Sequence, residues 1–215
     1  MFKKILLGLV ALVVLLVIVI QTRPSELTVT RSKLMTAPQA AVFEQVNDFH
    51  KWENWSPWAK VDPNAKSTFS GPEAGEGAKF AWDGNSEVGQ GEMTIVESHP
   101  NDHIKIKLEF IKPFPGVNDV NFTFKPEGDK TNVTWTMAGQ QNFMCKAIGL
   151  VMDMDKMCGD MFEKGLADIE KQANGGSPAA APPASTTPEI KAADPEPKQI
   201  NPLDAPKPLE VQPNS

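Results

Sequence analysis

The chain has 215 residues, of which 22% are charged, and a formal net charge of −6 at pH 7. Beyond Lys3 and Lys4 its basic residues form no cluster, which argues against a nucleic-acid binder, since such proteins carry a concentrated positive surface. Two cysteines, Cys145 and Cys158, are too few for a disulfide framework or a cysteine-based zinc site, and we expect both to be free. The length suits one ordinary domain with appendages.

Residues 5–20 form an unbroken apolar run directly after Lys3 and Lys4. As a helix, the run would span roughly 24 Å at about 1.5 Å per residue, close to the roughly 30 Å hydrocarbon core of a bilayer. A cleaved signal peptide begins in the same way, but the residues after the run lack the small-x-small cleavage pattern. We therefore predict an uncleaved transmembrane anchor over residues 1–23.

The charges on the two sides of this anchor are nearly balanced: Lys3, Lys4 and the amino terminus face Arg23, Arg31 and Lys33. A very short basic N-terminal tail normally stays in the cytoplasm. We accordingly expect a single-pass protein of a bacterial inner (plasma) membrane, with its N-terminus in the cytoplasm and its domain on the outer, periplasmic side.

After the anchor, residues 27–35 predict a strand rich in threonine and valine. Thr36 then fits a helix N-cap, Gln39 completes a capping box, and Pro38 is tolerated in the first turn. The predicted helix ends near Asp48.

Three of the five tryptophans, Trp52, Trp55 and Trp58, follow within one short segment. Pro57 limits this segment to one or two short helical turns. The indoles could contact a ligand, anchor the chain at a membrane surface, or fill the core. Neighbouring charges and the separate apolar anchor weaken the membrane alternative. We predict that two of the three plug the core, and we keep a cavity rim formed by His50 and the three indoles as the minority alternative.

From residue 78 onward, apolar positions alternate with polar ones. The pattern recurs in residues 78–82, 91–97, 103–110, 120–124 and 132–137. Such alternation indicates an antiparallel sheet covered on one face only. With the first strand, these runs predict a sheet of six to seven strands.

Residues 143–173 predict one long C-terminal helix, although its glycines weaken the helix propensity. The first half is apolar over more than half of its circumference, so we expect it to be buried on two sides. Asp155 lies within the apolar stripe, where an unpaired charge is costly. It could act as a general base or bind a ligand hydroxyl, or it could accept a structural hydrogen bond. We favour the structural role.

Residues 174–215 are rich in proline and alanine and contain no aromatic residue. Such a segment buries too little apolar area to offset chain entropy, which predicts a disordered tail. Its prolines, such as Pro195 and Pro197, offer a possible docking segment for a protein partner. The folded domain is then expected over residues 24–173.

This α+β order of elements resembles the helix-grip fold of the START-like, or SRPBCC, superfamily, in particular its polyketide cyclase/dehydrase-like branch. The stretches that carry the resemblance are APQAAVFEQVNDFHKWENWSPW, GEGAKFAWDGN, VGQGEMTIVESHPNDHIKIKLEF, TNVTWTM and MDMDKMCGDMFEKGLADIE. The resemblance covers about residues 27–171. It implies a curved antiparallel sheet wrapped round a long C-terminal helix, with a cavity between them that accepts an apolar ligand. It implies no catalytic motif, because none is shared across this branch.

If such a cavity is present, its walls come from one set of mostly apolar residues. The candidates are Phe80, Trp82, Met93, Ile106, Leu108, Phe122, Trp135, Met152, Asp155 and Cys158. Apolar walls with few polar groups suit a lipid, an isoprenoid or a polycyclic ring. The same side chains could instead simply fill the core.

The sequence predicts no catalytic residue, metal or cofactor. His50, His99 and His103 form no set with a nucleophile, metal-ligand spacing is absent, and we expect His99 and His103 to be solvated. The leading hypothesis is a membrane-tethered, non-enzymatic domain that binds a hydrophobic small molecule or lipid. The alternatives are a cyclase/dehydrase-type enzyme that acts on an apolar substrate in the same cavity, and a ligand-free interaction module.

Overall fold

The computed structural model describes residues 2–175. Its elements are, in chain order, α1 (Phe2–Gln21), β1 (Glu26–Met35), α2 (Gln39–Asn47), η1 (Phe49–Lys51), α3 (Trp52–Trp55), α4 (Pro57–Val61), β2 (Lys66–Ser70), β3 (Lys79–Asp83), β4 (Gln90–His99), β5 (His103–Lys112), β6 (Gly116–Glu127), β7 (Lys130–Gln140), α5 (Phe143–Ile148) and α6 (Met154–Gly175). The predicted tail and its protein partner concern residues 174–215, nearly all of which lie outside the described residues.

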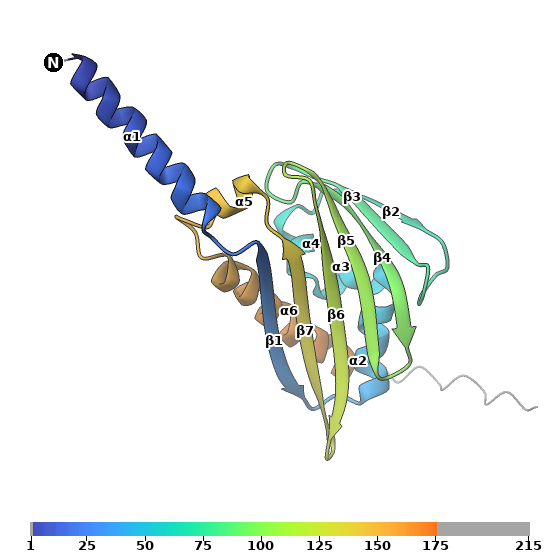
Figure 1. The fold of residues 1–215 in the computed structure, drawn as a ribbon. Coiled ribbons are helices and arrows are strands. Elements are labelled where there is room, and N and C mark those ends of the chain that lie inside the picture. Colours follow the sequence, from blue (N-terminus) through green and yellow to red (C-terminus); the bar gives the residue numbers. More distant parts are fainter. Residues whose placement is uncertain (1, 176–215) are drawn as a thin grey trace, which may run out of the picture. The chain divides into compact units, whose positions relative to one another are not determined.

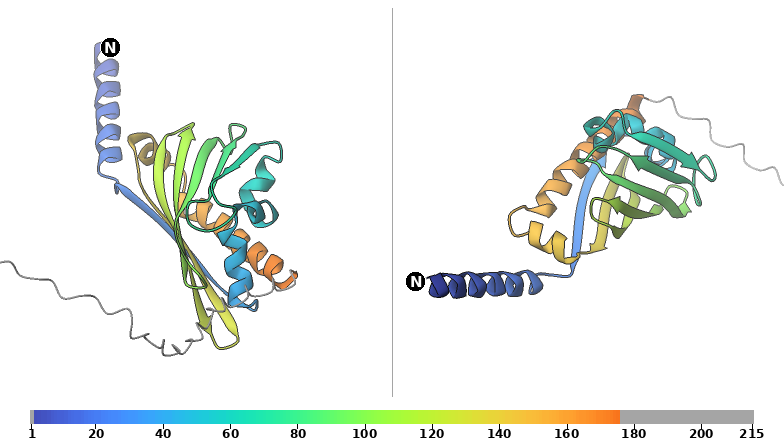
Figure 2. Two further views of the ribbon diagram at one scale, coloured as in Figure 1. Left: turned by 90° about the vertical axis from the view of Figure 1, so that its right-hand side faces the viewer. Right: turned by 90° about the horizontal axis from the view of Figure 1, so that it is seen from above.

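The seven strands form one antiparallel sheet in the order β1-β7-β6-β5-β4-β3-β2. The sheet is curved, and α2, α3, α4 and α6 lie on one of its faces (Figures 1 and 2). The predicted α+β fold is confirmed. Strand β2 escaped prediction because KSTFS contains a single apolar residue, Phe69, and so shows no alternation.

The inner face of the sheet is formed by alternate residues of each strand. On β6, Val120, Phe122 and Phe124 are buried, while the intervening residues are at least partly exposed. Helix α6 packs against β1 and presents Phe162 and Leu166 to the core. The predicted one-sided burial of the sheet therefore follows from its period of two.

The tryptophan segment fills the core between the sheet and α6. Trp55 is fully buried and Trp52 is 6% exposed. The Trp52 indole N–H donates to the backbone oxygen of Val46, and that of Trp55 donates to the backbone oxygen of Gln45. Each indole N–H thus has a hydrogen-bond acceptor at the C-terminal end of α2. A buried tryptophan usually has such a partner.

The predicted capping box at Thr36 is wrong. Helix α2 begins at Gln39, and its N-cap residue, Pro38, makes no side-chain cap bond. The Thr36 backbone N–H instead donates to Glu170 Oε1 at 2.9 Å, and the Gln39 side chain donates to the backbone oxygen of Phe124. Tertiary partners on α6 and β6 have replaced the local ones.

We expect Glu170→Gln to lower the free energy of unfolding by about 1 kcal/mol at neutral pH, because a hydrogen bond to a charged group contributes more free energy than a neutral one. The effect is no larger because this side chain is partly exposed. The hydrogen bond from the Thr36 backbone, together with Lys33, lowers the pKa of Glu170. A lowered pKa stabilises the fold above the unfolded-state value of about 4.5, and this contribution disappears as the pH falls through the folded-state pKa. Urea unfolding of both proteins at several pH values checks this, and a difference that persists unchanged in acid would contradict it.

The predicted single helix over residues 143–173 is also wrong, because it is broken between α5 and α6. Gly149 caps α5, and the Asp153 side chain accepts a hydrogen bond from the Lys156 backbone N–H at 3.0 Å where α6 begins. The predicted two-sided burial fails with it. Val151 is 84% exposed, and Met152 is 47% exposed.

Candidate functional site

An open hollow of about 530 Å³ lies where the chain passes from α1 into the domain. It is lined by Arg23, Pro24, Glu26 and Leu27 around the start of β1, by Gln141 and Lys146, and by residues 149–155 of the connection into α6. The C-terminal end of α1 contacts α5, and Arg23 Nη2 donates to the Gly149 backbone oxygen at 2.7 Å. The helix break therefore creates one wall of the hollow.

The apolar part of the lining is Leu27, Leu150, Val151, Met152 and Met154. Further apolar side chains are exposed on the two helices that flank the break: Phe143, Met144 and Met157 are each between 44% and 47% exposed. We call these eight residues the apolar rim. Val151 and Met152 are exposed within this lining, and exposed apolar side chains that border a hollow are typical of a site that meets a ligand, a membrane or a partner.

Lys146 is the buried charged residue of this hollow, with 8% of its surface exposed. Among residues 2–175, the hydrogen-bond partner of its ammonium group is the Ser25 hydroxyl, at 3.0 Å. A buried lysine is normally paired with an anion. The hollow thus combines an apolar rim with charged residues of both signs, and among these Lys146 is buried and bonded to a neutral hydroxyl.

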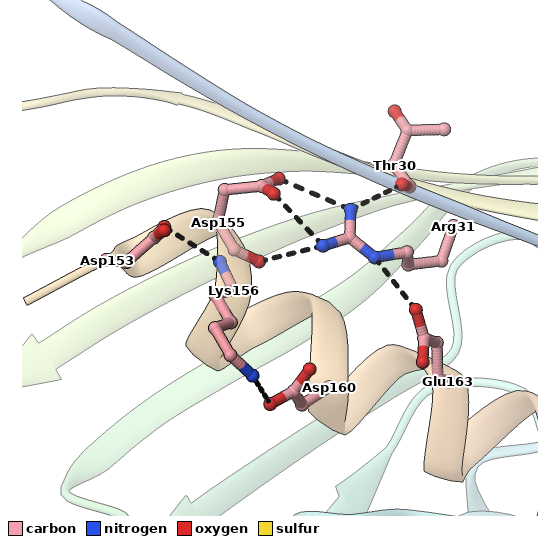
Figure 3. A network of polar contacts seen from close by, with 7 residues as sticks. All are labelled: Thr30, Arg31, Asp153, Asp155, Lys156, Asp160 and Glu163. Carbon is pink, nitrogen blue, oxygen red and sulfur yellow. Dashed lines mark hydrogen bonds and ion pairs between the residues drawn. The ribbon is translucent and has the colours of Figure 1, made fainter.

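Arg31 of β1 joins the sheet to the start of α6 beside the hollow (Figure 3). Its guanidinium donates to Asp155 Oδ2 at 3.0 Å and to the Asp155 backbone oxygen at 3.1 Å, and its Nε lies 3.2 Å from Glu163 Oε1. Hydrogen bonding to Asp155 is the largest cause of a raised pKa for Arg31, opposed by desolvation. These exposed contacts link the start of α6 to β1.

The predicted burial of Asp155 is wrong. Its side chain is 54% exposed, and its partner is Arg31 rather than an indole or a helix N-terminus. The error follows from the helix break, since Asp155 lies in the first turn of α6 and not in the middle of a longer helix. The desolvation that motivated a general-base role is therefore absent.

Most predicted cavity residues lie on the inner face of the sheet. Met93, Ile106, Leu108, Phe122 and Trp135 are buried, and Phe80 and Trp82 are half-buried against them. In this core the Trp135 ring stacks on Phe162, with centroids 4.1 Å apart. Trp135 Nε1 is buried without a hydrogen-bond partner among the described residues. Of the predicted set, Met152 and Asp155 alone line the hollow.

Cys158 is half-buried on α6. Burial, and then the charge of Asp155, raises the pKa of its thiol. A raised pKa leaves little thiolate at neutral pH, so this cysteine is poorly suited to act as a nucleophile.

The predicted rim residues lie away from the hollow. Trp52 and Trp55 are core residues, while Trp58 is 37% exposed and packs edge-on against Trp135. His50 stacks on Phe69 and places Nδ1 2.9 Å from Asp48 Oδ1. None of the four lines the hollow that the helix break creates.

Sequence reasoning missed Arg23, Lys146 and Leu150 as site residues. The available signal was Gly149, which ends α5, followed by Asp153, which fits a helix N-cap. Reading this pair as a break would have placed the intervening apolar residues on an exposed turn.

The family described as "Polyketide cyclase / dehydrase and lipid transport" matches residues 26–174. No curated protein matches the chain in sequence. Solved structures of similar fold include a protein from Mesorhizobium loti, with 14% identity and a TM-score of 0.52 over 70% of this chain and 99% of that one. A protein from Chromobacterium violaceum has 14% identity and a TM-score of 0.51 over 68% and 96%. One from Arthrobacter aurescens has 16% identity and a TM-score of 0.50 over 70% and 88%. At these identities the likeness concerns the fold alone.

Proposed function

Because this chain belongs to the polyketide cyclase/dehydrase and lipid transport family, we propose that it is a membrane-tethered, non-enzymatic domain that binds a hydrophobic small molecule or lipid. The observation that carries the proposal is the hollow with its apolar rim, which directly follows the apolar helix α1. A non-enzymatic role is preferred over a cyclase/dehydrase activity because Asp155, the carboxylate on which the enzyme alternative depended, is bound to Arg31.

The hollow has the size of a ligand site, and its lining is mixed: apolar side chains lie beside Arg23, Lys146 and the carboxylates of Glu26, Asp153 and Asp155. Its volume of about 530 Å³ falls within the roughly 300–1,000 Å³ of small-molecule sites. Met152 and Met154 are flexible and polarizable, so they adapt to acyl chains or ring systems of different shape. Burial of the rim against a ligand would remove apolar surface from water, at about 25 cal/mol per Å².

Lys146 favours a ligand with an acidic or strongly polar head. Its ammonium group donates to the neutral Ser25 hydroxyl, and a carboxylate or phosphate would form a stronger, charge-assisted bond there. We infer that the ligand places an apolar body against Val151 and Met152 and an anionic head near Lys146.

We expect Lys146→Met to reduce the amount of co-purifying anionic ligand about tenfold or more, since removing one partner of a buried charge pair costs 2–5 kcal/mol. The measurement is organic extraction and mass spectrometry of the full chain purified in detergent. Lys164→Met, an exposed lysine of α6, is the matched control and should behave as wild type. Equal recovery from Lys146→Met and wild type would contradict the role of Lys146. Recovery of no apolar species from wild type would contradict the binding function itself.

Helix α1 supplies the proposed tether. It has 20 residues, of which Ile20 alone is buried among those described, and a helix of this length spans about 30 Å. A tether next to the hollow would let an apolar ligand pass between bilayer and domain without crossing water. The proposed orientation puts the N-terminus in the cytoplasm and the domain on the periplasmic side.

We expect the protein to remain in bacterial membranes under alkaline washing, and to be released when residues 2–21 are deleted. The purified wild type should have the intact mass of the full chain. A mature mass that lacks these residues would identify α1 as a cleaved signal sequence. Protection of the domain from protease added to spheroplasts would contradict the proposed orientation and indicate a cytoplasmic domain.

A further inference from the structure

The end of the β4–β5 hairpin brings two histidines and a glutamate together. His99 and His103 are the last paired residues of the β4–β5 ladder, and Glu97 precedes His99 on the same strand. The predicted solvation of both histidines fails for His103, whose side chain is 24% exposed, whereas that of His99 is 57% exposed. This hairpin end lies at the opposite end of the sheet from α5 (Figure 1).

The potential ligand atoms of these three residues converge. Glu97 Oε1 lies 2.7 Å from His103 Nε2 and 3.0 Å from His99 Nε2. The two imidazole rings are stacked with centroids 4.5 Å apart, and all three ligand atoms lie within 4.8 Å of one another. Tetrahedral Zn²⁺ with bonds of about 2.0–2.1 Å separates its ligand atoms by about 3.3–3.4 Å. The three atoms are therefore close enough to share one ion once the two imidazole rings turn out of their stacked arrangement.

A second layer of contacts orients the ligand atoms. Asp102 Oδ2 lies 2.9 Å from His103 Nδ1, so the N–H on Nδ1 can be donated to the carboxylate and the lone pair of Nε2 is directed at the cluster. Lys105 donates to the other oxygen of Glu97, Oε2, and leaves Oε1 for the cluster. Metal-binding histidines regularly donate their second ring N–H to a carboxylate in this way.

The turn that carries these groups is held in place by the rest of the domain. The Asp102 backbone N–H donates to the His99 backbone oxygen at 3.0 Å, and the Phe124 backbone N–H donates to Asp102 at 2.8 Å. The Gln39 side chain of α2 donates to the backbone oxygen of Asn101. A site on a hairpin anchored to a helix and a neighbouring strand keeps its ligands close before any ion arrives.

We propose that Glu97, His99 and His103 bind a divalent transition-metal ion of the Zn²⁺ type, with water at the fourth position. Zn²⁺ accepts both imidazole and carboxylate ligands, whereas Mg²⁺ and Ca²⁺ prefer sets made of oxygen ligands, so the two imidazoles favour an ion of the Zn²⁺ type. The carboxylates of Glu97 and Asp102 balance the charge of the ion beside Lys105. The bound ion ties β4 to β5 and is independent of ligand binding in the hollow.

The test is Zn²⁺ binding to the full chain, purified in detergent with a histidine-free tag and treated with a chelator. Calorimetry is expected to show one saturable site, and Zn²⁺ is expected to raise the melting temperature, since an ion that binds only the native state stabilises it. His103→Ala should abolish both effects. Asp102→Asn, which keeps all three ligands, should weaken the affinity about 10–100-fold. Co²⁺ bound in place of Zn²⁺ should show the strong visible absorption that is typical of a four-coordinate site.

The pair of His50 and Asp48 provides the matched control, because it has the same imidazole–carboxylate contact at 2.9 Å but no second histidine. His50→Ala and Asp48→Asn should leave Zn²⁺ affinity unchanged. Melting curves in chelator check that each variant is folded. Absence of saturable binding in wild type, or wild-type binding by folded His103→Ala, would overturn the proposal. Unchanged affinity in Asp102→Asn would overturn the second-layer role of that carboxylate.

Discussion

Replacing Trp55 by alanine is expected to destabilise the domain by about 3–5 kcal/mol, as is typical of removing a fully buried aromatic side chain. Trp55 has no exposed surface, and its ring packs edge-on against Phe122 and Trp135. The substitution leaves a cavity and also frees the backbone oxygen of Gln45. Because domains of this size are stable by about 5–15 kcal/mol, the loss is a large fraction of the total.

Urea unfolding of the full chain in detergent, followed by circular dichroism, measures this loss. Trp58→Ala is the matched control: its ring is 37% exposed and makes edge contacts with Trp135 and Phe162. Loss of these contacts and of the partly buried ring surface should cost about 2 kcal/mol, less than the loss at Trp55. If the two variants were equally stable, Trp55 would not be the core residue that its burial implies.

The second effect is expected from Gly165→Ala on α6, which should destabilise the domain by about 1 kcal/mol. A Cβ at Gly165 would lie 2.8 Å from Cζ3 of Trp135 and 3.3 Å from Cδ of Pro57. The Trp135 ring cannot retreat, because it is stacked on Phe162 and edged by Trp55. Overpacking of this kind costs about 1–3 kcal/mol, and the gain in helix propensity returns at most about 1 kcal/mol, so the net change is a loss of stability.

Gly159→Ala provides the control on the same helix. A Cβ there would overlap the guanidinium of Arg31, which is the far end of a flexible side chain and can therefore move aside. This movement would break the exposed ion pair of Arg31 with Asp155. The gain in helix propensity offsets that loss, so the melting temperature should change little. A similar drop in both variants would show that glycine itself, rather than the contact with Trp135, is what α6 requires.

The strands were predictable because their alternation follows from local geometry and one-sided burial. In β5, Ile104, Ile106 and Leu108 are buried as their spacing indicates. The capping of α2 was not predictable, since Glu170, which holds Thr36, lies 134 residues further along the chain. Local rules identify which groups need a partner, and only the fold decides which partner is near.

The candidate site was the least predictable part. Helical projection across residues 143–173 assumed one continuous helix, and the break at Gly149 and Asp153 moved Val151, Met152 and Asp155 from the expected core to the surface. The histidine cluster was missed for a related reason. The spacing of His99 and His103 suggests a metal site only once the hairpin register places them opposite each other.

By itself, the sequence determined the apolar helix, the antiparallel sheet and the aromatic core, because each depends on the periodicity or length of apolar runs. The tertiary structure decided where charges and polar groups go. Arg31 meets Asp155 across 124 residues, and Lys146 is enclosed beside the linker that follows α1. Hydrophobic burial is set by pattern, whereas the pairing of polar groups depends on distance and direction in the folded chain.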